Sequence, residues 1–162
     1  MFGFLNKKKV NINEIVAVAN GKMIDITKVK DPMFAQKMMG DGVAFEVDED
    51  EVTVCSPCSG IMKVLFSTGH AFGVQMENGI EILIHIGIDT VEANGDGFSV
   101  LHVKQNDHVK QGQPIVKVNI KKIKEHYDVP IMMVFTNTNG HNLTMPSEKK
   151  VTSKEVIMTI NA

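Results

Sequence analysis

The sequence lacks a long uninterrupted run of apolar residues. Although 43% of its 162 residues are hydrophobic, no stretch approaches the roughly 20 residues that a membrane-spanning helix needs. The N-terminus also lacks the long apolar segment and the cleavage site of a secretory signal peptide. These absences predict a protein that stays in the cytoplasm.

An excess of positive charge and a set of cysteines are absent as well. Seventeen basic residues stand against 19 acidic residues, so the formal net charge is −2, and nucleic-acid binding is not expected. The two cysteines lie in CSPC at positions 55–58 and cannot form the several disulfides of a small secreted domain. The CxxC spacing occurs in redox and zinc motifs, but no second pair and no helix pattern follow it, so we interpret it as a turn.

What the chain does contain is typical of an all-β protein. Short segments rich in Val, Ile and Phe are interrupted by Gly, Asn and Asp. Their spacing predicts a single antiparallel β-sandwich, barrel-like in its closure, with one or two short helices. The helices fit residues 31–39, where Asp31 can cap the first turn and Pro32 suits the first helical position, and residues 119–128 after Asn119. The strand segments are expected at 12–26, 42–47, 51–66, 70–76, 80–88, 98–104, 108–120, 130–137 and 156–161.

The two ends of the chain carry separate expectations. Residues 13–162 are expected to form the single domain, and residues 1–12 to form a tail that begins MFGFLNKKK. This tail is either flexible or an amphipathic segment that makes weak contact with an anionic membrane surface. A start and a stop within 162 residues favour a free-standing protein.

Two histidines flank a turn signal in STGHAFGVQMENGIEILIHIGIDT, residues 67–90. The pair Asn78-Gly79 between apolar runs predicts a two-residue hairpin loop, because both central residues of a type I′ turn need positive φ. On that register Phe72 faces His85, and His70 is its diagonal neighbour on the same face of the sheet, within reach of its ring. A slip of one residue would send the two rings to opposite faces.

The same register predicts apolar surroundings for the two rings. Phe72, Val74, Met76 and Leu83 would share their face, with Glu81 at the turn end. Such surroundings disfavour the imidazolium form, so both rings should be neutral near pH 7 and able to act as nucleophiles. Thr68 would lie on this face too, where its hydroxyl can fix the tautomer of His70.

A rigid pair of histidines suits two kinds of chemistry. One ring can be phosphorylated while the other donates a hydrogen bond to a phosphoryl oxygen. Alternatively, His70 and His85 can both ligate zinc in an interaction module, with Asp89 or Glu81 as a further ligand. The spacing leaves both interpretations open. The remaining histidines lack a comparable context and are expected to be solvated: His102, His108, His126 and His141.

Three segments carry a family resemblance: GIEILIHIGIDTV at 79–91, STGHAF at 67–72 and KDPMFAQKMMGDG at 30–42. Together they resemble the glucose-family IIA component of the bacterial phosphoenolpyruvate-dependent sugar phosphotransferase system, over about residues 15–137. The resemblance implies a cytoplasmic phosphotransferase component of β-sandwich fold that needs no cofactor. It also implies that His85 is phosphorylated, that His70 stabilises the phosphoryl group and that Thr68 orients His70.

The resemblance further implies two protein partners. The histidine-containing phosphocarrier protein would donate the phosphoryl group, and a cysteine of the IIB domain of a sugar permease would accept it. Both would dock on an apolar surface with an acidic rim. The apolar surface would supply affinity, and the acidic rim would attract a basic partner. The apolar positions are Phe34, Met38, Met39, Phe66 and Leu83, and the rim positions are Asp31 and Asp89. For Phe34, Met38 and Met39, packing of a short helix on the sheet is an equally good interpretation.

Overall fold

The structure is a computed structural model that describes residues 13–160, so the expected N-terminal tail at residues 1–12 lies outside the described residues. Within this range the strands are β1 (Glu14–Val16), β2 (Gly21–Asp25), β3 (Gly42–Glu46), β4 (Glu51–Cys55), β5 (Gly60–Leu65), β6 (Ala71–Gln75), β7 (Glu81–Ile86), β8 (Phe98–Val100), β9 (His108–Val109), β10 (Pro114–Asn119), β11 (Ile131–Asn137), β12 (Lys149–Val151) and β13 (Val156–Thr159). The helices are α1 (Pro32–Ala35), α2 (Ile120–Ile123) and the 3₁₀ helices η2 (Ile26–Lys28) and η3 (Thr90–Ala93).

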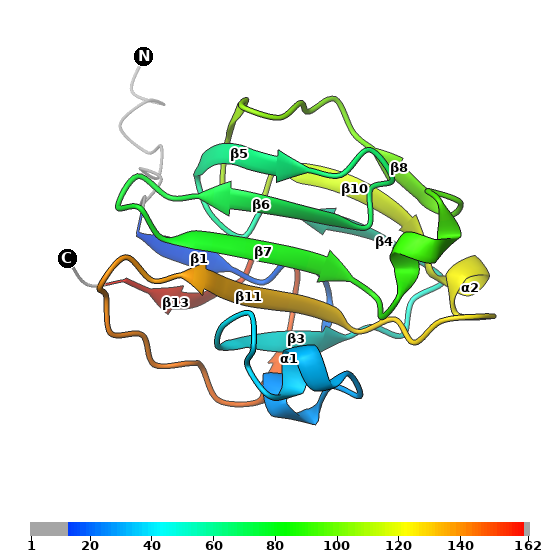
Figure 1. Ribbon diagram of the computed structural model, residues 1–162, viewed down its shortest axis with the longest axis horizontal. Helices are drawn as coiled ribbons and strands as arrows, with labels where there is room; N and C mark the ends of the chain where they lie inside the picture. Colours follow the sequence, from blue (N-terminus) through cyan, green and yellow to red (C-terminus); the bar gives the residue numbers. More distant parts are fainter. Residues whose placement is uncertain (1–12, 161–162) are drawn as a thin grey trace, which may run out of the picture.

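The strands form antiparallel sheets that enclose one main core. The largest sheet has the order β12-β2-β3-β11-β7-β6-β5-β9, and a smaller sheet with the order β4-β10-β8 lies behind it in Figure 1. Strands β1 and β13 pair separately. Buried residues of both sheets, such as Phe72 and Ile84 from one and Val54 and Val116 from the other, belong to a single hydrophobic cluster. The predicted antiparallel all-β sandwich with short helices is therefore confirmed.

Both short helices begin where capping residues were expected. The Asp31 side chain accepts a hydrogen bond from the Met33 N–H at 2.9 Å, and Pro32 is the first residue of α1. The Asn119 side chain accepts a bond from the Lys122 N–H at 3.1 Å at the start of α2. Each cap satisfies a backbone donor that the first helical turn leaves unpaired. Helix α1 and helix η2 lie against the outer face of the large sheet, over β3 and β11 (Figure 1).

Several predicted segments contain more structure than the pattern indicated. Segments 12–26, 51–66 and 108–120 each resolve into two strands separated by a turn. The CSPC segment is one of these turns, as expected, and the Ser56 hydroxyl donates to the Cys58 carbonyl oxygen at 2.7 Å within it. Strand β12 was not predicted, because Lys-Lys-Val at 149–151 has no alternating apolar pattern.

The predicted register of the β6–β7 hairpin is wrong by one residue. Ala71, not Phe72, faces His85, and Gln75 faces Glu81. The loop has three residues, Glu77-Asn78-Gly79, because the Gly79 N–H bonds back to the Met76 carbonyl oxygen at 2.9 Å and only Gly79 has positive φ, at 90°. This is the three-residue loop in which glycine takes the left-handed position after a turn, in place of a two-residue type I′ loop.

The slip changes which side chains share a face. Phe72, Val74 and Met76 point into the main core, whereas Leu83 and His85 lie on the outer face under α1. The expectation that all of them surround the two rings is therefore wrong.

Among the helices in residues 13–160, none is long and apolar enough to cross a membrane.

Candidate functional site

His85 is positioned by the central strand β7. Alternate residues of this strand point into the core, so Ile84 and Ile86 are buried on one face while His85 stays half-buried on the other. The neighbouring strands place Ala71 and Met132 beside it. The ring of Phe34, from α1, lies against it with centroids 5.2 Å apart. The imidazole is thereby held on a rigid sheet and packed from one side.

His70 reaches the same face although its place in the hairpin is next to Ile86, which points inward. It lies just before β6, in a bend that follows Gly69, and its carbonyl oxygen accepts the Ile86 N–H at 2.7 Å. Gly69 has φ of 75°, and a Cβ placed on it would lie 3.0 Å from Cβ of Phe98 and 3.4 Å from Cγ2 of Val100, which are partly buried against the core. This left-handed residue interrupts the strand alternation, so the His70 ring turns outward. Its side chain contacts the ring of Phe66, with centroids 4.9 Å apart.

The two imidazoles meet in an edge-to-face arrangement. Their centroids are 5.4 Å apart and their planes are inclined by 79°. Nδ1 of His85 lies 2.8 Å from the carbonyl oxygen of Gly87, and Nδ1 of His70 lies 2.6 Å from the Thr68 hydroxyl oxygen. A carbonyl oxygen only accepts, so Nδ1 of His85 carries a proton and its Nε2 has a free lone pair.

The surroundings favour the uncharged form of both rings. Burial lowers the pKa of His85 below the ordinary value of 6.5, opposed by the hydrogen bond to Gly87 and by the carboxylates of Asp31 and Asp89. Burial also lowers the pKa of His70, with a further contribution from the positive charge that His85 would carry. Both pKa values shift in the direction that the expectation of neutral rings near pH 7 requires, although the apolar residues around the rings are not those that the predicted register supplied.

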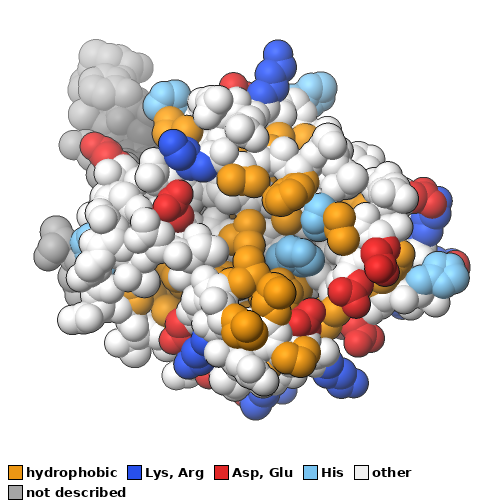
Figure 2. Space-filling model, viewed as in Figure 1, with side chains coloured by type: hydrophobic (Ala, Val, Ile, Leu, Met, Phe, Trp, Pro, Cys, Tyr) orange, Lys and Arg blue, Asp and Glu red, His pale blue; other side chains and the backbone are white. Residues whose placement is uncertain are grey.

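A hollow of about 330 Å³ opens over the two rings. Figure 2 shows two histidine side chains at the centre of this face, with hydrophobic side chains gathered around them and acidic side chains along one side. The hollow is lined by Asp31, Met33, Phe34, Met39, Phe66, His70, Ala71, Leu83, His85, Asp89 and Val91.

Most of the predicted surface residues come together here. Phe34, Met39, Phe66, Leu83 and both aspartates line the hollow, but Phe34 is only 4% exposed and also packs in the cluster beneath α1. Met38 does not line it and is 70% exposed.

Sequence reasoning missed several groups of this site. The missing side chains are Met33 and Val91, which are half exposed, and the missing backbone group is the Gly87 carbonyl. Val91 ends the segment 79–91 that carries the family resemblance, but its residue type alone did not indicate that it lines the site. A backbone acceptor leaves no signal in a sequence.

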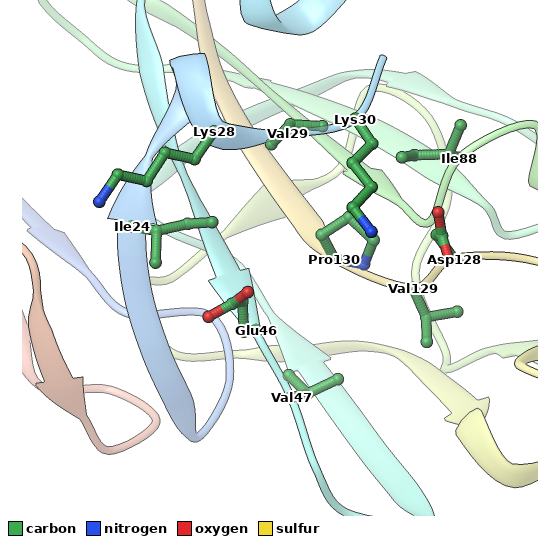
Figure 3. A pocket seen from close by; sticks show the side chains of 10 residues that line it. All are labelled: Ile24, Lys28, Val29, Lys30, Glu46, Val47, Ile88, Asp128, Val129 and Pro130. Atoms are coloured by element: carbon green, nitrogen blue, oxygen red, sulfur yellow. The ribbon is translucent and has the colours of Figure 1, made fainter.

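A second cavity, of about 250 Å³, lies beside the segments that precede Asp31 and Asp89 (Figure 3). Its walls combine apolar side chains with two lysines and two carboxylates. They are Ile24, Lys28, Val29, Lys30, Glu46, Val47, Ile88, Asp128, Val129 and Pro130. The cavity does not include either histidine of the pair.

The structure does not support a zinc site. Within residues 13–160, no group of three or more His, Cys, Asp and Glu side chains lies close enough together to hold a metal ion. Asp89 and Glu81, the further ligands considered for His70 and His85, therefore do not complete a metal site. Of the other histidines, His102, His108 and His126 are exposed, which fits their expected solvation, whereas His141 is half-buried.

A family model decides the identity of this fold and site. The model for the phosphoenolpyruvate-dependent sugar phosphotransferase system, EIIA 1, matches residues 13–141. The chain belongs to this family. A solved structure, the glucose permease IIA from Mycoplasma capricolum, agrees: it is 34% identical, with a TM-score of 0.82 over 89% of this chain and 92% of that chain. The family resemblance seen in the sequence is confirmed.

Two longer proteins of Staphylococcus carnosus (strain TM300) are also similar. The PTS system glucose-specific EIICBA component is 40% identical over 147 residues, and the PTS system glucoside-specific EIICBA component is 40% identical over 148 residues. These alignments cover 90% and 91% of this chain but only 21% of each relative. The chain thus spans about a fifth of their length and corresponds to the EIIA part of the sugar phosphotransferase system.

Proposed function

We propose that this IIA chain carries a phosphoryl group on Nε2 of His85, between the histidine-containing phosphocarrier protein and the IIB domain of a sugar permease. The observation that carries this proposal is the hydrogen bond from Nδ1 of His85 to the Gly87 carbonyl oxygen, at 2.8 Å. It leaves the Nε2 lone pair free on a ring that faces a second histidine in an open hollow. A free lone pair on a neutral nitrogen is what a nucleophile for phosphoryl transfer requires.

The transfer needs little machinery besides alignment. The Nε2 lone pair of His85 forms the new N–P bond while the N–P bond of the donor phosphohistidine breaks, and the bonding electrons return to the donor ring nitrogen. In the second step the sulfur of a IIB cysteine thiolate forms the S–P bond and the His85 N–P bond breaks. Because both partners in the first step are imidazole nitrogens, the protein mainly supplies orientation and exclusion of water.

His70 has the role of stabilising the phosphoryl oxygens. The Thr68 hydroxyl lies 2.6 Å from Nδ1 of His70, and when it donates to that nitrogen the remaining proton of the neutral ring is on Nε2. The Nε2–H can then donate to a phosphoryl oxygen on His85, whose ring is 5.4 Å away between centroids. A preorganised donor of this kind stabilises charge on the transferring group without reorganisation.

The hollow around the pair is the proposed docking surface for both partners. Phe66, Met39 and Leu83, together with the newly identified Met33 and Val91, give apolar contact area. Asp31 and Asp89 give a negative rim that attracts a basic partner. Met38, which does not line the hollow, is proposed only as an outlying contact.

The choice of sugar is not expected to depend on this domain. The two EIICBA relatives are equally similar to the chain, at 40% identity, although one is named for glucose and the other for glucosides. We therefore place the chain with a permease of the glucose and glucoside class, at the cytoplasmic face where phosphoryl donors reside. In the EIICBA relatives, a segment similar to this chain is part of a longer polypeptide. The IIB domain that accepts the phosphoryl group from this chain is either a separate protein or part of the same polypeptide.

A radiolabel transfer assay tests the proposal. The chain is incubated with labelled histidine-containing phosphocarrier protein, and then with a IIB domain. The unmutated chain should acquire one acid-labile, alkali-stable phosphate and release it to IIB. His85→Ala should acquire none, whereas His70→Ala should still be loaded. His108→Ala, which alters an exposed histidine on the edge strand β9, is the matched control and should behave as the unmutated chain.

The zinc interaction module is tested in the same preparation. Stoichiometric zinc that depends on His70 and His85, with no phosphate acquired by the unmutated chain, would overturn the proposed function. Label that persists in His85→Ala would show that another residue is phosphorylated.

A further inference from the structure

Thr90 is a buried polar residue that the proposed chemistry does not use. Its side chain is fully buried at the first position of η3, five residues after His85. The hydroxyl donates to the carbonyl oxygen of Ile86, which is the residue that follows His85. A buried hydroxyl needs a hydrogen-bond partner, but here the partner belongs to the segment that shapes the site.

The segment between His85 and Thr90 folds back in a tight loop. Gly87 and Asp89 both have left-handed backbone angles, with φ of 78° and 62°. The N–H of Gly87 donates to the Pro130 carbonyl oxygen at 2.8 Å, and the N–H of Ile88 donates to the Asp128 carbonyl oxygen at 2.9 Å. Figure 3 shows Ile88 beside Asp128 and Pro130, in the segment that leads into β11.

These bonds hold the two peptide groups on either side of Gly87. The Ile86–Gly87 peptide is held at its N–H by Pro130 and at its carbonyl by Thr90. The Gly87–Ile88 peptide is held at its N–H by Asp128, and its carbonyl oxygen accepts the proton of His85 Nδ1. Only the backbone angles of Gly87 separate the two peptides, and glycine restricts these angles less than any other residue.

Thr90 also packs directly on Gly87. A methyl group placed at the Cβ position of Gly87 would lie 2.5 Å from Cγ2 of Thr90, so the Thr90 side chain occupies the space beside the Gly87 backbone. The hydroxyl of Thr90 therefore holds the preceding peptide while its methyl group confines the glycine. Both restraints act on the residue whose carbonyl sets the tautomer of His85.

We propose that Thr90 is a positioning residue that holds the Gly87 carbonyl against Nδ1 of His85 and thereby keeps the Nε2 lone pair of His85 free. The inference rests on the proposed function in that Nε2 is the phosphorylated atom. Thr90 does not touch the phosphoryl group and acts through the loop and the tautomer.

The test uses two variants that separate the hydroxyl from the methyl group. Thr90→Val keeps the shape and removes the donor, whereas Thr90→Ser keeps the donor and removes the methyl group. Ring ¹⁵N chemical shifts of His85 in the unphosphorylated protein, recorded near pH 8, report the tautomer. The unmutated chain and Thr90→Ser should show the Nδ1–H form, and Thr90→Val should show a mixture with the Nε2–H form. Phosphoryl acceptance should fall about fivefold in Thr90→Val, as for the loss of one ordinary hydrogen bond.

The outcomes distinguish this inference from the proposed function. An unchanged tautomer in a folded Thr90→Val would overturn the positioning role, even if His85 is phosphorylated normally. If Thr90→Val does not fold, Thr90→Ala replaces it, because this variant also lacks the hydroxyl, and an unchanged tautomer there would overturn the positioning role. Absence of phosphate on His85 in the unmutated chain would instead overturn the proposed function, and the tautomer measurement, which needs no phosphate, would be unaffected.

Discussion

His70 and His85 bring their rings to within 5.4 Å of each other, although regular strand alternation in the observed register would direct their side chains to opposite faces of the sheet. The meeting depends on the bend before β6, where Gly69 has φ of 75° and its backbone lies close to the side chains of Phe98 and Val100. The sheet supplies a rigid position for His85, and an interruption of the sheet supplies the position of His70.

Gly69→Ala should separate the two rings. An alanine at this left-handed position costs about 1–2 kcal/mol, and its Cβ would lie 3.0 Å from Cβ of Phe98. We expect a loss of stability of that size in urea denaturation, together with weaker stabilisation of the phosphoryl group. Gly140→Ala is the matched control, because Gly140 has φ of 78° but no atom within 4 Å of the added Cβ. Equal transfer rates in these two variants would argue against the role assigned to the bend.

Thr68→Val should slow transfer to IIB more than it affects folding. The substitution removes the hydroxyl that lies 2.6 Å from Nδ1 of His70, so this ring no longer has a preferred tautomer. We expect about a fivefold loss in the rate of onward transfer, with label still acquired by His85. Thr68→Ser should restore most of the rate. The proposed orientation of His70 is wrong if Thr68→Val and Thr68→Ser are equally impaired.

Asp31→Asn separates the capping of helix α1 by Asp31 from the effect of its negative charge on His85 and on partner binding. Asparagine caps a helix as well as aspartate does, so α1 and the packing of Phe34 on His85 should remain. In the unmutated chain, the carboxylate of Asp31 raises the pKa of His85. The variant lacks this charge, so its His85 should show a lower pKa in an NMR titration. Binding of a basic partner should also slow, most clearly at low salt. Asp107→Asn, which alters an exposed aspartate that accepts the Lys104 N–H, should change neither property.

Acid should both destabilise the protein and stop phosphoryl acceptance. Burial lowers the pKa of His70 and His85 in the folded chain below 6.5, so the unfolded chain binds protons more readily at these two rings. Their contribution to stability is therefore lost as the pH falls from about 6.5 through the folded-state pKa values. Acceptance falls over the same range because protonated Nε2 has no lone pair.

Chemical denaturation between pH 5 and pH 8 measures this dependence. The double variant His70→Ala with His85→Ala should have a flatter profile, whereas His108→Ala should keep the profile of the unmutated chain. A double variant with an unchanged slope would mean that other groups control the acid sensitivity.

The sequence predicted best those features of the site that depend on side-chain type. The two histidines, Thr68 and the cap at Asp31 could each be assigned from residue type and spacing, and the structure brings all four together. The hairpin register could not be assigned, because Asn-Gly suits both a two-residue and a three-residue loop and the choice depends on packing beyond the hairpin.

The ring contact was predicted for a reason that the structure does not support. The prediction relied on regular alternation, and the contact arises from the bend at Gly69 instead. Backbone groups were not predictable either: the Gly87 carbonyl fixes the tautomer of His85, and every residue type carries such a carbonyl. Met33 and Val91 line the hollow from α1 and η3, and the sequence did not indicate where these helices would lie relative to the two histidines.

The two cysteines should be inert in the folded protein. Burial raises the pKa of Cys58 to about 12 and also raises that of Cys55, and both thiols are free and buried. Since the thiolate is the reactive form, a thiol reagent at pH 8 should label neither residue until the chain unfolds, and then both. Ser99→Cys, which places a thiol on an exposed position of β8, should react at once and shows that the reagent is active. Rapid labelling of Cys55 or Cys58 in the native state would contradict this prediction and would indicate that the turn at 55–58 opens.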